Sequence, residues 1–382
     1  MENTPLAGLK VIELARILAG PWVGQTLSDL GADVIKVESP EGDDTRRWGP
    51  PYFDVEGEQS AAYFHGCNRG KRSVTADFRD VQGQELVREL VSQADVLIEN
   101  FKLGGLEKYG LDYESLKKIN PRLIYCSITG FGHDGPYAER AGYDFMIQGM
   151  AGIMDLTGEP EREPQKIGVA FADIFTGLYS VIAIQSALMM RERTGHGQHI
   201  DMALFDCMTA VLANQGMNYL ATGKAPKRMG NAHPNIAPYQ TLPVSDGYFI
   251  IACGNDGQFA KLAKLLGLDG VAEDENYATN AARVKNRESL TAMLEEKTRG
   301  WNRDALLAEL EKLKVPAGPI NSVADVFSDP QFIARNMQIN PQNVPGLRTP
   351  IRFSDAVLNL DKRSPMLGEH NAEIAEFLKM GS

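Results

Sequence analysis

The sequence predicts an α/β protein with two domains. Its first half alternates apolar strands and helices, beginning with the β-α-β pattern "LKVIELA", "PWVGQTLSDLGA" and "DVIKVES". Two strands joined by a helix in this way run parallel, with a right-handed crossover. A length of 382 residues exceeds what one hydrophobic core usually holds, so a second domain is expected. We therefore expect a large Rossmann-like domain and a smaller α/β domain.

Local signals place the elements of the first half. Pro21 lies in the first turn of the first helix and Gly31 lies near its end. "GQELVRELVSQA" has apolar residues at helical spacing, and "DVLIEN" and "RLIYCSITG" predict further strands. Residues 40–71 are rich in Gly, Pro and charge. This stretch is too long for a routine connection and indicates a functional or interface loop.

The second half opens with a long apolar helix, "KIGVAFADIFTGLYSVIAIQSALMM", followed by the strand "HGQHIDMAL". "GYFIIACGNDGQFAKLAKLLGL" predicts a strand, a turn and a helix that open the smaller domain, and helical patterns follow from Arg287 and Arg303. The expected organisation is a large domain at 1–200 and 330–382, a linker helix at 201–224 and a small domain at 225–329.

Composition excludes several classes of protein. The net charge of −11 and the pI of about 5.2 argue against a nucleic-acid-binding protein, which usually carries a basic domain. The start "MENTP" has no apolar run, and no uncharged stretch of about twenty apolar residues indicates a membrane span. The cytoplasm is therefore the expected location. The cysteines stand far apart, as is typical of reduced structural thiols: Cys67, Cys126, Cys207 and Cys253.

Metal and serine-hydrolase chemistry are also disfavoured. His196, His199 and His233 have no Glu or Cys at zinc-ligand spacing, so no metal site is expected. The G-x-S-x-G nucleophile elbow is absent.

Asp173 is unusual because it is the one acid near the start of a long apolar helix. If the helix begins near Phe171, Asp173 lies in the first turn, where the macrodipole stabilises an anion. Gly177 in mid-helix costs about 1 kcal/mol relative to Ala, so it requires a reason such as close approach of a backbone or ligand. The alternative is a structural acid at a helix start. The neighbours at helical spacing form a face of mainly small residues: Val169, Ala170, Thr176, Gly177 and Ser180.

Two glycine-rich turns are further candidates. "SITGFGHDGPY" contains G-x-G-x-x-G but continues into Pro136 instead of a helix, so a loop bend competes with a phosphate-binding turn. "GNDGQF" lies between a strand and a helix, where Gly254 and Gly257 would let the chain fold over a bound group. Its alternative is an ordinary turn capped by Asp256. Basic residues in the long polar loop and after "DVLIENF" suit a phosphate or scattered surface charge about equally.

Taken together, the motifs resemble the class III CoA-transferase family, which contains formyl-CoA transferase, the carnitine CoA-transferases and the alpha-methylacyl-CoA racemases. The resemblance covers nearly the whole chain. The motifs that carry it are "LKVIELARILAGPWVGQTLSDLGADVIKVESP", "NRGKRSVTADF", "DVLIENF", "NPRLIYCSITGFGHDGPY", "AGYDFMIQGMAGIM", "ADIFTGLYSVIAIQSAL", "TGHGQHIDMALFD", "LLAELEKLKVPAGPINSVADVFSDPQ" and "MLGEHN".

The resemblance implies an architecture that composition does not. Family members build the large domain from both chain ends, and the chain forms an open ring. Two rings interlock as an obligate homodimer, with the active site between domains and subunits. The substrates would be an acyl-CoA and a small carboxylic acid, with no tightly bound cofactor.

The resemblance also implies roles for individual residues. Asp173, in "FADIFTG", would be the nucleophile that forms an aspartyl anhydride and then an aspartyl-CoA thioester. The helix terminus would keep it ionised. Gly254 and Gln258 would belong to a glycine loop that shields the anhydride from water. The positions matching CoA contacts are Ile17, Leu18, Ala19, Arg72, Asn100, Phe101 and Lys108.

One position separates the two chemistries of the family. Racemases remove an alpha proton with a histidine in a "GHD" motif, where this chain has "GYD" with Tyr143. A tyrosine with a pKa near 10 is a poor base at neutral pH but can steady a carboxylate or oxyanion. This favours CoA transfer over the alternative, an alpha-methylacyl-CoA racemase or epimerase.

Local differences from other members of the family limit the range of expected substrates. Leu18 stands where formyl-CoA transferase has glutamine, which argues against formyl-CoA as the donor. "GNAHPNIAPYQTL" and "GNDGQF" look closer to members that use dicarboxylates or oxalate, so succinyl-CoA or acetyl-CoA is the expected donor. Arg16, Arg47 or Arg140 would pair with a substrate carboxylate. Two other classes stay open at this point, a dinucleotide-dependent oxidoreductase and a non-catalytic CoA-binding protein.

Overall fold

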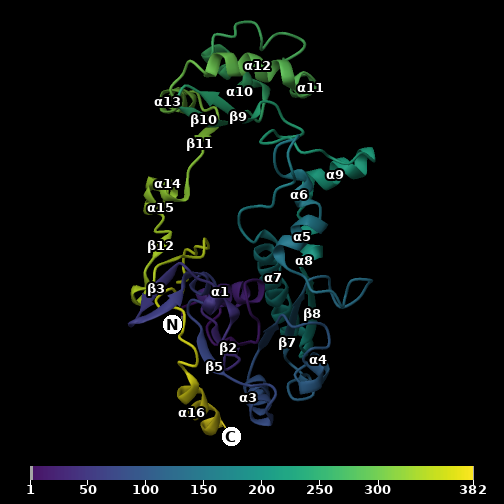
Figure 1. The fold of residues 1–382 in the computed structure, drawn as a ribbon, viewed down its shortest axis with the longest axis vertical. Coiled ribbons are helices and arrows are strands. Elements are labelled where there is room, and N and C mark those ends of the chain that lie inside the picture. Colours follow the sequence, from purple (N-terminus) through teal and green to yellow (C-terminus); the bar gives the residue numbers. More distant parts are fainter. Residues whose placement is uncertain (1–2, 382) are drawn as a thin grey trace. The chain divides into compact units, whose positions relative to one another are not determined.

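The computed structural model describes residues 3–381, which divide into two compact units (Figure 1). Unit 1 contains the residues up to 153, then 166–217 and from 330 onward; unit 2 contains 154–165 and 218–329. The predicted linker helix at 201–224 is wrong, since this segment holds the end of a strand and two separate helices. Residues 154–165 also join unit 2, which the sequence patterns do not indicate.

Unit 1 is built on a six-stranded parallel sheet, as the β-α-β pattern predicts. The strand order is β5-β2-β1-β6-β7-β8. On the central strand, Val11 pairs with Val34 on one side and Val96 on the other. The strands are β1 (Lys10–Glu13), β2 (Asp33–Glu38), β5 (Arg72–Thr75), β6 (Val96–Glu99), β7 (Ile124–Thr129) and β8 (Gln198–Ala203).

Helices cover both faces of this sheet, since alternate strand residues point to opposite sides. Val11 and Ile98 face a core formed with α1 (Ala19–Asp29), α7 (Phe171–Thr194) and α8 (Leu204–Ala210). Ile12 and Leu97 face a second core. The helices on that side are α3 (Val81–Ser92), α4 (Tyr113–Leu116) and α16 (Asn371–Gly381).

The polar region 40–71 is not a simple loop. It contains a hairpin whose turn residues Glu56 and Gly57 both have positive φ, at 55° and 88°. That geometry matches the right-handed twist of hairpin strands. The elements are η1 (Asp44–Arg47), β3 (Tyr52–Val55), β4 (Glu58–Ala61) and α2 (Ala62–His65).

The "MLGEHN" motif attaches the end of the chain to the edge strand β5, beside which α16 lies in Figure 1. The Ser73 N–H donates to His370 Nδ1 at 3.2 Å, and the His370 N–H donates to the Ser73 carbonyl at 2.9 Å. Asn371 bonds the backbone and side chain of Thr75. These bonds cover an edge that would otherwise expose unpaired backbone groups.

Unit 2 centres on a three-stranded antiparallel sheet of order β11-β10-β9, with its own core around Phe249, Phe259 and Leu294. Its elements are β9 (Tyr239–Val244), β10 (Gly247–Ala252), α10 (Asp256–Leu265), α11 (Asn280–Lys285), α12 (Arg287–Thr298), α13 (Arg303–Lys312), β11 (Ala317–Pro319) and α14 (Val323–Ser328). The remaining elements of the chain are η2 (Glu107–Tyr109), α5 (Asp144–Met150), α6 (Ile153–Leu156), α9 (Ala213–Thr222), α15 (Pro330–Ala334), β12 (Gln338–Ile339), η3 (Pro341–Asn343) and β13 (Gly346–Leu347).

Candidate active site

A cavity of about 380 Å³ lies where the strand order of unit 1 reverses. From β1 the chain first adds β2 on one side and later β6 on the other, so β1 and β6 flank the switch point. Ligands of open parallel sheets bind outside the carboxyl ends of strands at such a point. The cavity is lined by residues that follow these two strands, Arg16–Ala19 and Asn100–Leu103, together with Asp173 of α7.

Most of the predicted site residues line this one cavity. Seven of the eleven do so: Ile17, Leu18, Ala19, Asn100, Phe101, Tyr143 and Asp173. Arg72 and Lys108 lie elsewhere in unit 1, while Gly254 and Gln258 belong to unit 2. A nucleophile candidate and a set of CoA-contact candidates, chosen from distant segments, are therefore neighbours in space.

Asp173 has a carboxyl group that is partly buried and has no partner in the described part of the chain. It lies in the first turn of α7, which begins at Phe171 as expected. Burial, and next the charge of Asp144, raise the pKa of Asp173 to about 7. Burial therefore opposes the stabilisation of the anion that the helix terminus is expected to provide. Within residues 3–381, no hydrogen bond or ion pair engages its carboxyl group.

Asp144 fixes the start of the helix that carries Asp173. Its carboxylate accepts the Ala172 N–H at 2.8 Å, which satisfies one of the free donors of the first turn. The Gln148 side chain donates to the same carboxylate at 2.8 Å and accepts the Ile167 N–H at 2.9 Å. These bonds hold the approach to α7 against α5.

Gly177 allows α1 to pack closely against α7. A Cβ atom at this position would lie 3.1 Å from the Ala19 carbonyl oxygen and 3.2 Å from Trp22 Cβ. The small-residue face of the Asp173 helix therefore receives the first turn of α1, which brings Ala19 into the same cavity as Asp173.

The turn between β1 and α1 is strained. Ile17 has φ 72°, a left-handed conformation that costs a β-branched residue about 1–3 kcal/mol. The Ile17 N–H donates to both oxygens of Asp43, at 3.2 and 3.3 Å. The Asn100 amide holds the preceding residue, accepting the Arg16 N–H at 2.9 Å and donating to the Arg16 carbonyl at 2.7 Å.

Three cationic side chains line the cavity. Arg16, Lys102 and Arg140 all line it and are exposed. Arg16 pairs with Asp44 at 3.2 Å, whereas Arg140 stacks on the Tyr137 ring at 3.9 Å. Among the described residues, no carboxylate pairs with Arg140. Its guanidinium is free to receive an anionic group.

Comparison with known proteins identifies the family. The model of CoA-transferase family III matches residues 6–371. The chain belongs to CoA-transferase family III. It is therefore a CoA-transferase that uses CoA thioesters as substrates, as its motifs predict.

Individual relatives support this assignment. The chain is 57% identical to a succinate–glutarate CoA-transferase of Agrobacterium fabrum (strain C58 / ATCC 33970), over 98% of this chain and 95% of that protein. It is 42% identical to an acetyl-CoA:oxalate CoA-transferase of Acetobacter aceti, over 92% and 89% of the two chains. The crystal structure of a CAIB/BAIF family protein from Brucella suis is 81% identical, with a TM-score of 0.90 over 98% of this chain and all of that one.

The pKa of Asp173 leads to a pH prediction. Only the carboxylate attacks a thioester, so kcat/KM for acyl-CoA should rise with pH to a plateau above about 7. Asp144→Asn keeps an oxygen for the Ala172 N–H but removes the charge that helps to raise the pKa of Asp173. The rising limb of the pH–rate profile should then move down by about half a pH unit or more. An unshifted limb would contradict the electrostatic role of Asp144.

Arg72 and Lys108 do not join the cavity. Arg72 begins β5, at the amino edge of the sheet, where its guanidinium pairs with Asp33 and Glu373 at 2.5 and 2.8 Å. Lys108 lies over the ring of its neighbour Tyr109 at 4.7 Å. The position of Arg72 favours a structural role, because both ends of its fork are occupied on the far side from the strands' carboxyl ends.

The glycine-rich turn of unit 2 has a defined cap. Asn255, not Asp256, caps α10, accepting the Gln258 N–H at 2.9 Å. The Gln258 side chain in turn accepts the Gly254 N–H at 2.8 Å. Gln258 therefore orders the exposed turn, and Asp256 pairs with Arg283 at 2.6 Å.

The glycines of "SITGFGHDGPY" have two different roles, a close backbone crossing at Gly130 and a bend at Gly132 and Gly135. A Cβ on Gly130 would lie 2.5 Å from the Gly142 Cα. The two backbone segments are therefore in direct contact at Gly142, the residue before Tyr143. Gly132 and Gly135 have φ of 87° and 80°. These glycines serve a loop bend, the alternative that the sequence leaves open.

Tyr63 is a neighbour of the site that sequence patterns do not indicate. Burial, and next the charge of Asp173, raise the pKa of Tyr63 to about 12. Its ring meets Trp48 edge to face at 5.2 Å. Both residues belong to the polar region 40–71, which is too long for a routine connection and is therefore expected to be functional.

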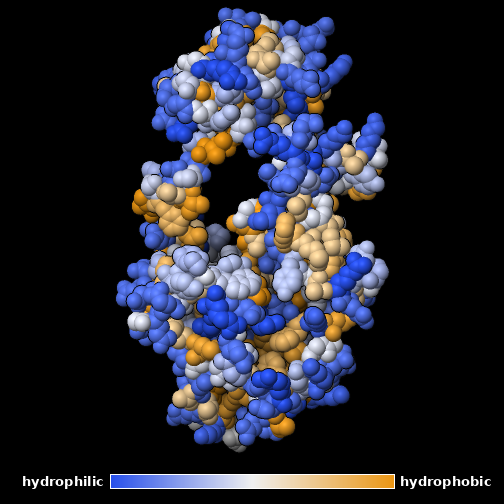
Figure 2. Space-filling view, viewed as in Figure 1, coloured by the Kyte–Doolittle hydropathy of each residue, from blue (hydrophilic) through white to orange (hydrophobic). Residues whose placement is uncertain are grey.

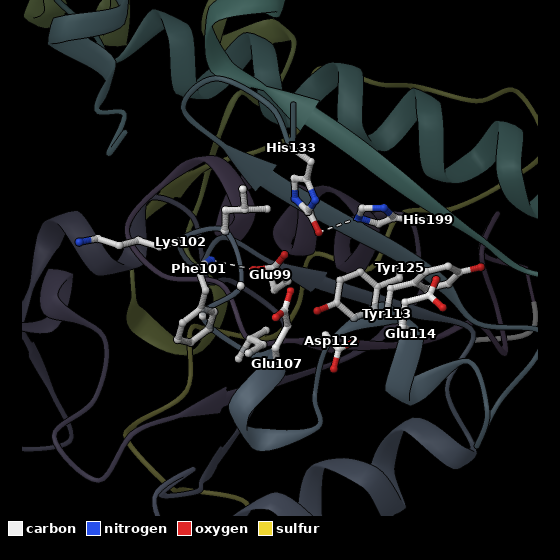
Figure 3. Close-up of a pocket in the computed structure, with 15 residues that line it drawn as sticks. Glu99, Phe101, Lys102, Glu107, Asp112, Tyr113, Glu114, Tyr125, His133 and His199 are labelled. Carbon is white, nitrogen blue, oxygen red and sulfur yellow. Dashed lines mark hydrogen bonds between the residues drawn. The ribbon is translucent and has the colours of Figure 1, made fainter. Parts of the chain in front are cut away.

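A second cavity, of about 190 Å³, is shown in Figure 3 and shares Phe101, Lys102, Leu103 and Gly105 with the lining of the Asp173 cavity. Glu99 points into it and accepts the Phe101 N–H at 2.7 Å. Burial raises the pKa of Glu99 to about 7, although hydrogen bonds from Ser127 and Phe101 oppose the shift. Ser127 also bonds His199 Nε2 at 2.9 Å. This network orders the base of the segment that lines the Asp173 cavity.

Neither a metal cluster nor a disulfide is found in the described part of the chain. All four cysteines are free and buried, as expected for structural thiols. Helix α7 is long and apolar enough to cross a membrane by length and composition. Its buried face, which includes Ala172, Val181 and Ile184, packs into the core of unit 1.

Proposed function

We propose that the protein moves CoA from succinyl-CoA to a small dicarboxylate of the glutarate type, with Asp173 as the covalent carrier. The observation that carries the proposal is a carboxyl group without a partner among the described residues, in a cavity at the switch point of the sheet that Arg16, Lys102 and Arg140 also line. The name of the relative at 57% identity supports the choice of succinate and glutarate as the first pair. Acetyl-CoA and oxalate are the second pair, because of the relative from Acetobacter aceti.

The transfer has four steps on one carboxylate. Asp173 attacks the thioester carbonyl of the donor and expels the CoA thiolate, which leaves a mixed anhydride. The thiolate attacks the Asp173 carbonyl, releasing the donor acid and forming an aspartyl-CoA thioester. The acceptor carboxylate attacks this thioester, giving a second anhydride and free thiolate. The thiolate finally attacks the acceptor's acyl carbon, which yields the new acyl-CoA and regenerates Asp173.

The environment of Asp173 supports this chemistry. A pKa near 7 leaves a sizeable fraction of the carboxyl group ionised at neutral pH, while its low hydration increases its reactivity. Tyr143 lines the same cavity, and we propose that its hydroxyl steadies the oxyanion of each tetrahedral intermediate. The Gly254–Gln258 turn is proposed to shield the anhydrides from water, by resemblance to the family's glycine loop.

CoA is proposed to enter along the residues that follow β1 and β6. Arg16 and Phe101 also line an adjoining cavity of about 350 Å³. That cavity contains the aromatic rings of Phe78 and Tyr109 and the guanidinium of Arg79, a combination that suits a base and phosphates. The pantetheine arm would then lead past Ile17–Ala19 to Asp173.

A panel of donors and acceptors tests the proposal. Succinyl-CoA, acetyl-CoA and formyl-CoA are each incubated with glutarate, oxalate and other small acids, and the new thioesters are identified by mass. We expect the succinyl-CoA and glutarate pair to be among the fastest. Formyl-CoA should be poor, because Leu18 replaces a glutamine of formyl-CoA transferase. Absence of transfer with every dicarboxylate pair would overturn the proposed substrate class.

We also propose a homodimer, interlocked as in the family, in the cytoplasm. Large apolar side chains are exposed on α5 and α7, among them Phe145 at 59% and Ile182 at 58%, and Figure 2 shows apolar residues gathered over this part of unit 1. Patches of this kind mark protein interfaces. Light scattering should give twice the chain mass of 41.9 kDa. A mass of one chain at micromolar concentration would contradict the dimer.

A further inference from the structure

The turn Arg16–Ala19 contains a strained backbone conformation, whose free-energy cost the surrounding contacts must offset. Ile17 adopts φ 72°, and a β-branched side chain rarely occupies this region. The same turn forms one wall of the Asp173 cavity. Strained backbone persists where neighbouring groups over-determine it, and such sites are often functional. The group that holds Ile17 is therefore a candidate for a role in the reaction.

Asp43 is that group. Both of its oxygens accept the Ile17 N–H, at 3.2 and 3.3 Å, and its side chain is fully buried. The carboxylate is itself fixed by the Thr45 backbone N–H at 3.0 Å and hydroxyl at 2.8 Å. On its other side, Lys36 lies 3.0 Å away. Asp43 thus reaches the strained peptide from a rigid position.

The charge of Asp43 is secured by a buried ion network. Lys36 also bonds Glu13 at 3.0 Å and the Ala15 carbonyl at 2.7 Å, while Lys71 pairs with Glu13 at 2.8 Å. The side chains of Asp43, Lys36, Glu13 and Lys71 are all 0% exposed. Burial tends to raise the pKa of Asp43, but Lys36 and the Thr45 bonds lower it below its usual value. Such a network is worth little for stability by itself but imposes one arrangement on what it contacts.

We propose that Asp43 is a positioning residue for CoA transfer, which holds Ile17 in its left-handed conformation so that the Arg16–Ala19 turn forms the wall of the Asp173 cavity. The inference rests on the proposed function, and it adds a residue that lines the adjoining cavity but not the Asp173 cavity. Asn100 assists by fixing both backbone groups of Arg16. A merely structural Asp43 would neutralise Lys36 and have no coupling to the conformation of Ile17.

The coupling is tested by a double-mutant cycle. Asp43→Ala is made in the natural background, in an Ile17→Gly background and, as a matched control, in an Ile17→Val background. Glycine adopts positive φ without a steric cost, whereas valine keeps the β-branch. We expect Asp43→Ala to lower kcat/KM about tenfold or more with Ile17 or I17V present, and less than about threefold with I17G. Equal losses in all three backgrounds would overturn the proposal.

A second variant and a structural readout complete the test. If Asp43→Ala does not fold, Asp43→Asn keeps the size of the side chain but removes one of the two oxygens that accept the Ile17 N–H, and the same pattern of losses is expected at a smaller size. Crystal structures of these variants should show residue 17 leaving positive φ; a φ near 72° in the absence of Asp43 would contradict the inference even if no activity is measured. If the unmutated protein shows no CoA transfer, this result counts against the proposed function and not against the role of Asp43.

Discussion

Asp173→Ala is expected to lower kcat for CoA transfer by about four orders of magnitude or more, because the step that accepts the acyl group loses its nucleophile. No other described carboxylate lines the cavity except Glu139. The variant should remain folded, since no hydrogen bond or ion pair of the described residues is lost. Turnover is measured with succinyl-CoA and glutarate, and folding by circular dichroism.

The raised pKa of Asp173 sets the sign of the stability change. Its folded pKa of about 7 exceeds its usual value of 3.8, so the folded protein binds more protons than the unfolded chain between these values. The ionised buried form therefore destabilises the fold as pH rises through 7. At pH 8, Asp173→Asn should melt no lower than the natural protein. A clearly lower melting temperature would indicate a structural role for the carboxylate.

Asp206 offers a matched control for the nucleophile. It also lies in the first turn of a helix, α8, and burial raises its pKa as well. It does not line the Asp173 cavity. Asp206→Asn should keep transfer within about threefold of the natural rate, as expected for a surface substitution. A loss comparable with that of Asp173→Ala would show that the assay responds to folding and not to the nucleophile.

Arg140→Gln is expected to raise KM for a dicarboxylate acceptor by about 10- to 100-fold, the range of one lost charge-assisted hydrogen bond. Arg140 lines the cavity without a carboxylate partner in the described residues, so the second carboxylate of the acceptor is its natural partner. KM for a monocarboxylate acceptor should change little, because that substrate has no second charge. Steady-state kinetics with acceptors of matched length provides the comparison.

Arg47 is the control for this prediction. It donates to the Glu41 carbonyl and pairs with Asp44, and it lies outside the cavity lining. Arg47→Gln should leave KM for both kinds of acceptor within about twofold. If Arg140→Gln raises KM equally for monocarboxylates and dicarboxylates, then Arg140 does not select the second carboxylate.

The strongly periodic parts of the chain were predictable. The alternation of apolar strands and helices placed the parallel sheet, and the apolar pattern around Asp173 placed α7 with its acid in the first turn. The family motifs indicated Ile17–Ala19, Asn100 and Tyr143 as site residues. The fold brings these residues to one cavity. These features follow from burial patterns or from whole motifs, and both can be recognised in a single sequence.

Other features depend on contacts that no local pattern encodes. The hairpin of β3 and β4 is too short to register as alternation. Nothing near Asp43 indicates that its carboxylate reaches Ile17, since the two meet only when β1 and β2 pair. The basic character of Arg72 suggested a phosphate contact, but its place at the amino edge of the sheet gives it acidic partners instead. Residue type alone does not report which edge of a sheet a side chain occupies.

Trapping the intermediate shows whether Asp173 carries CoA covalently. The protein is incubated with succinyl-CoA and hydroxylamine, which attacks an activated aspartyl carbonyl and leaves a hydroxamate as CoA or acid departs. The peptides are then identified by mass spectrometry. We predict a hydroxamate at Asp173 that requires the acyl-CoA and is absent from Asp206. Rapid transfer with no modification of Asp173 would show that Asp173 is not the covalent carrier.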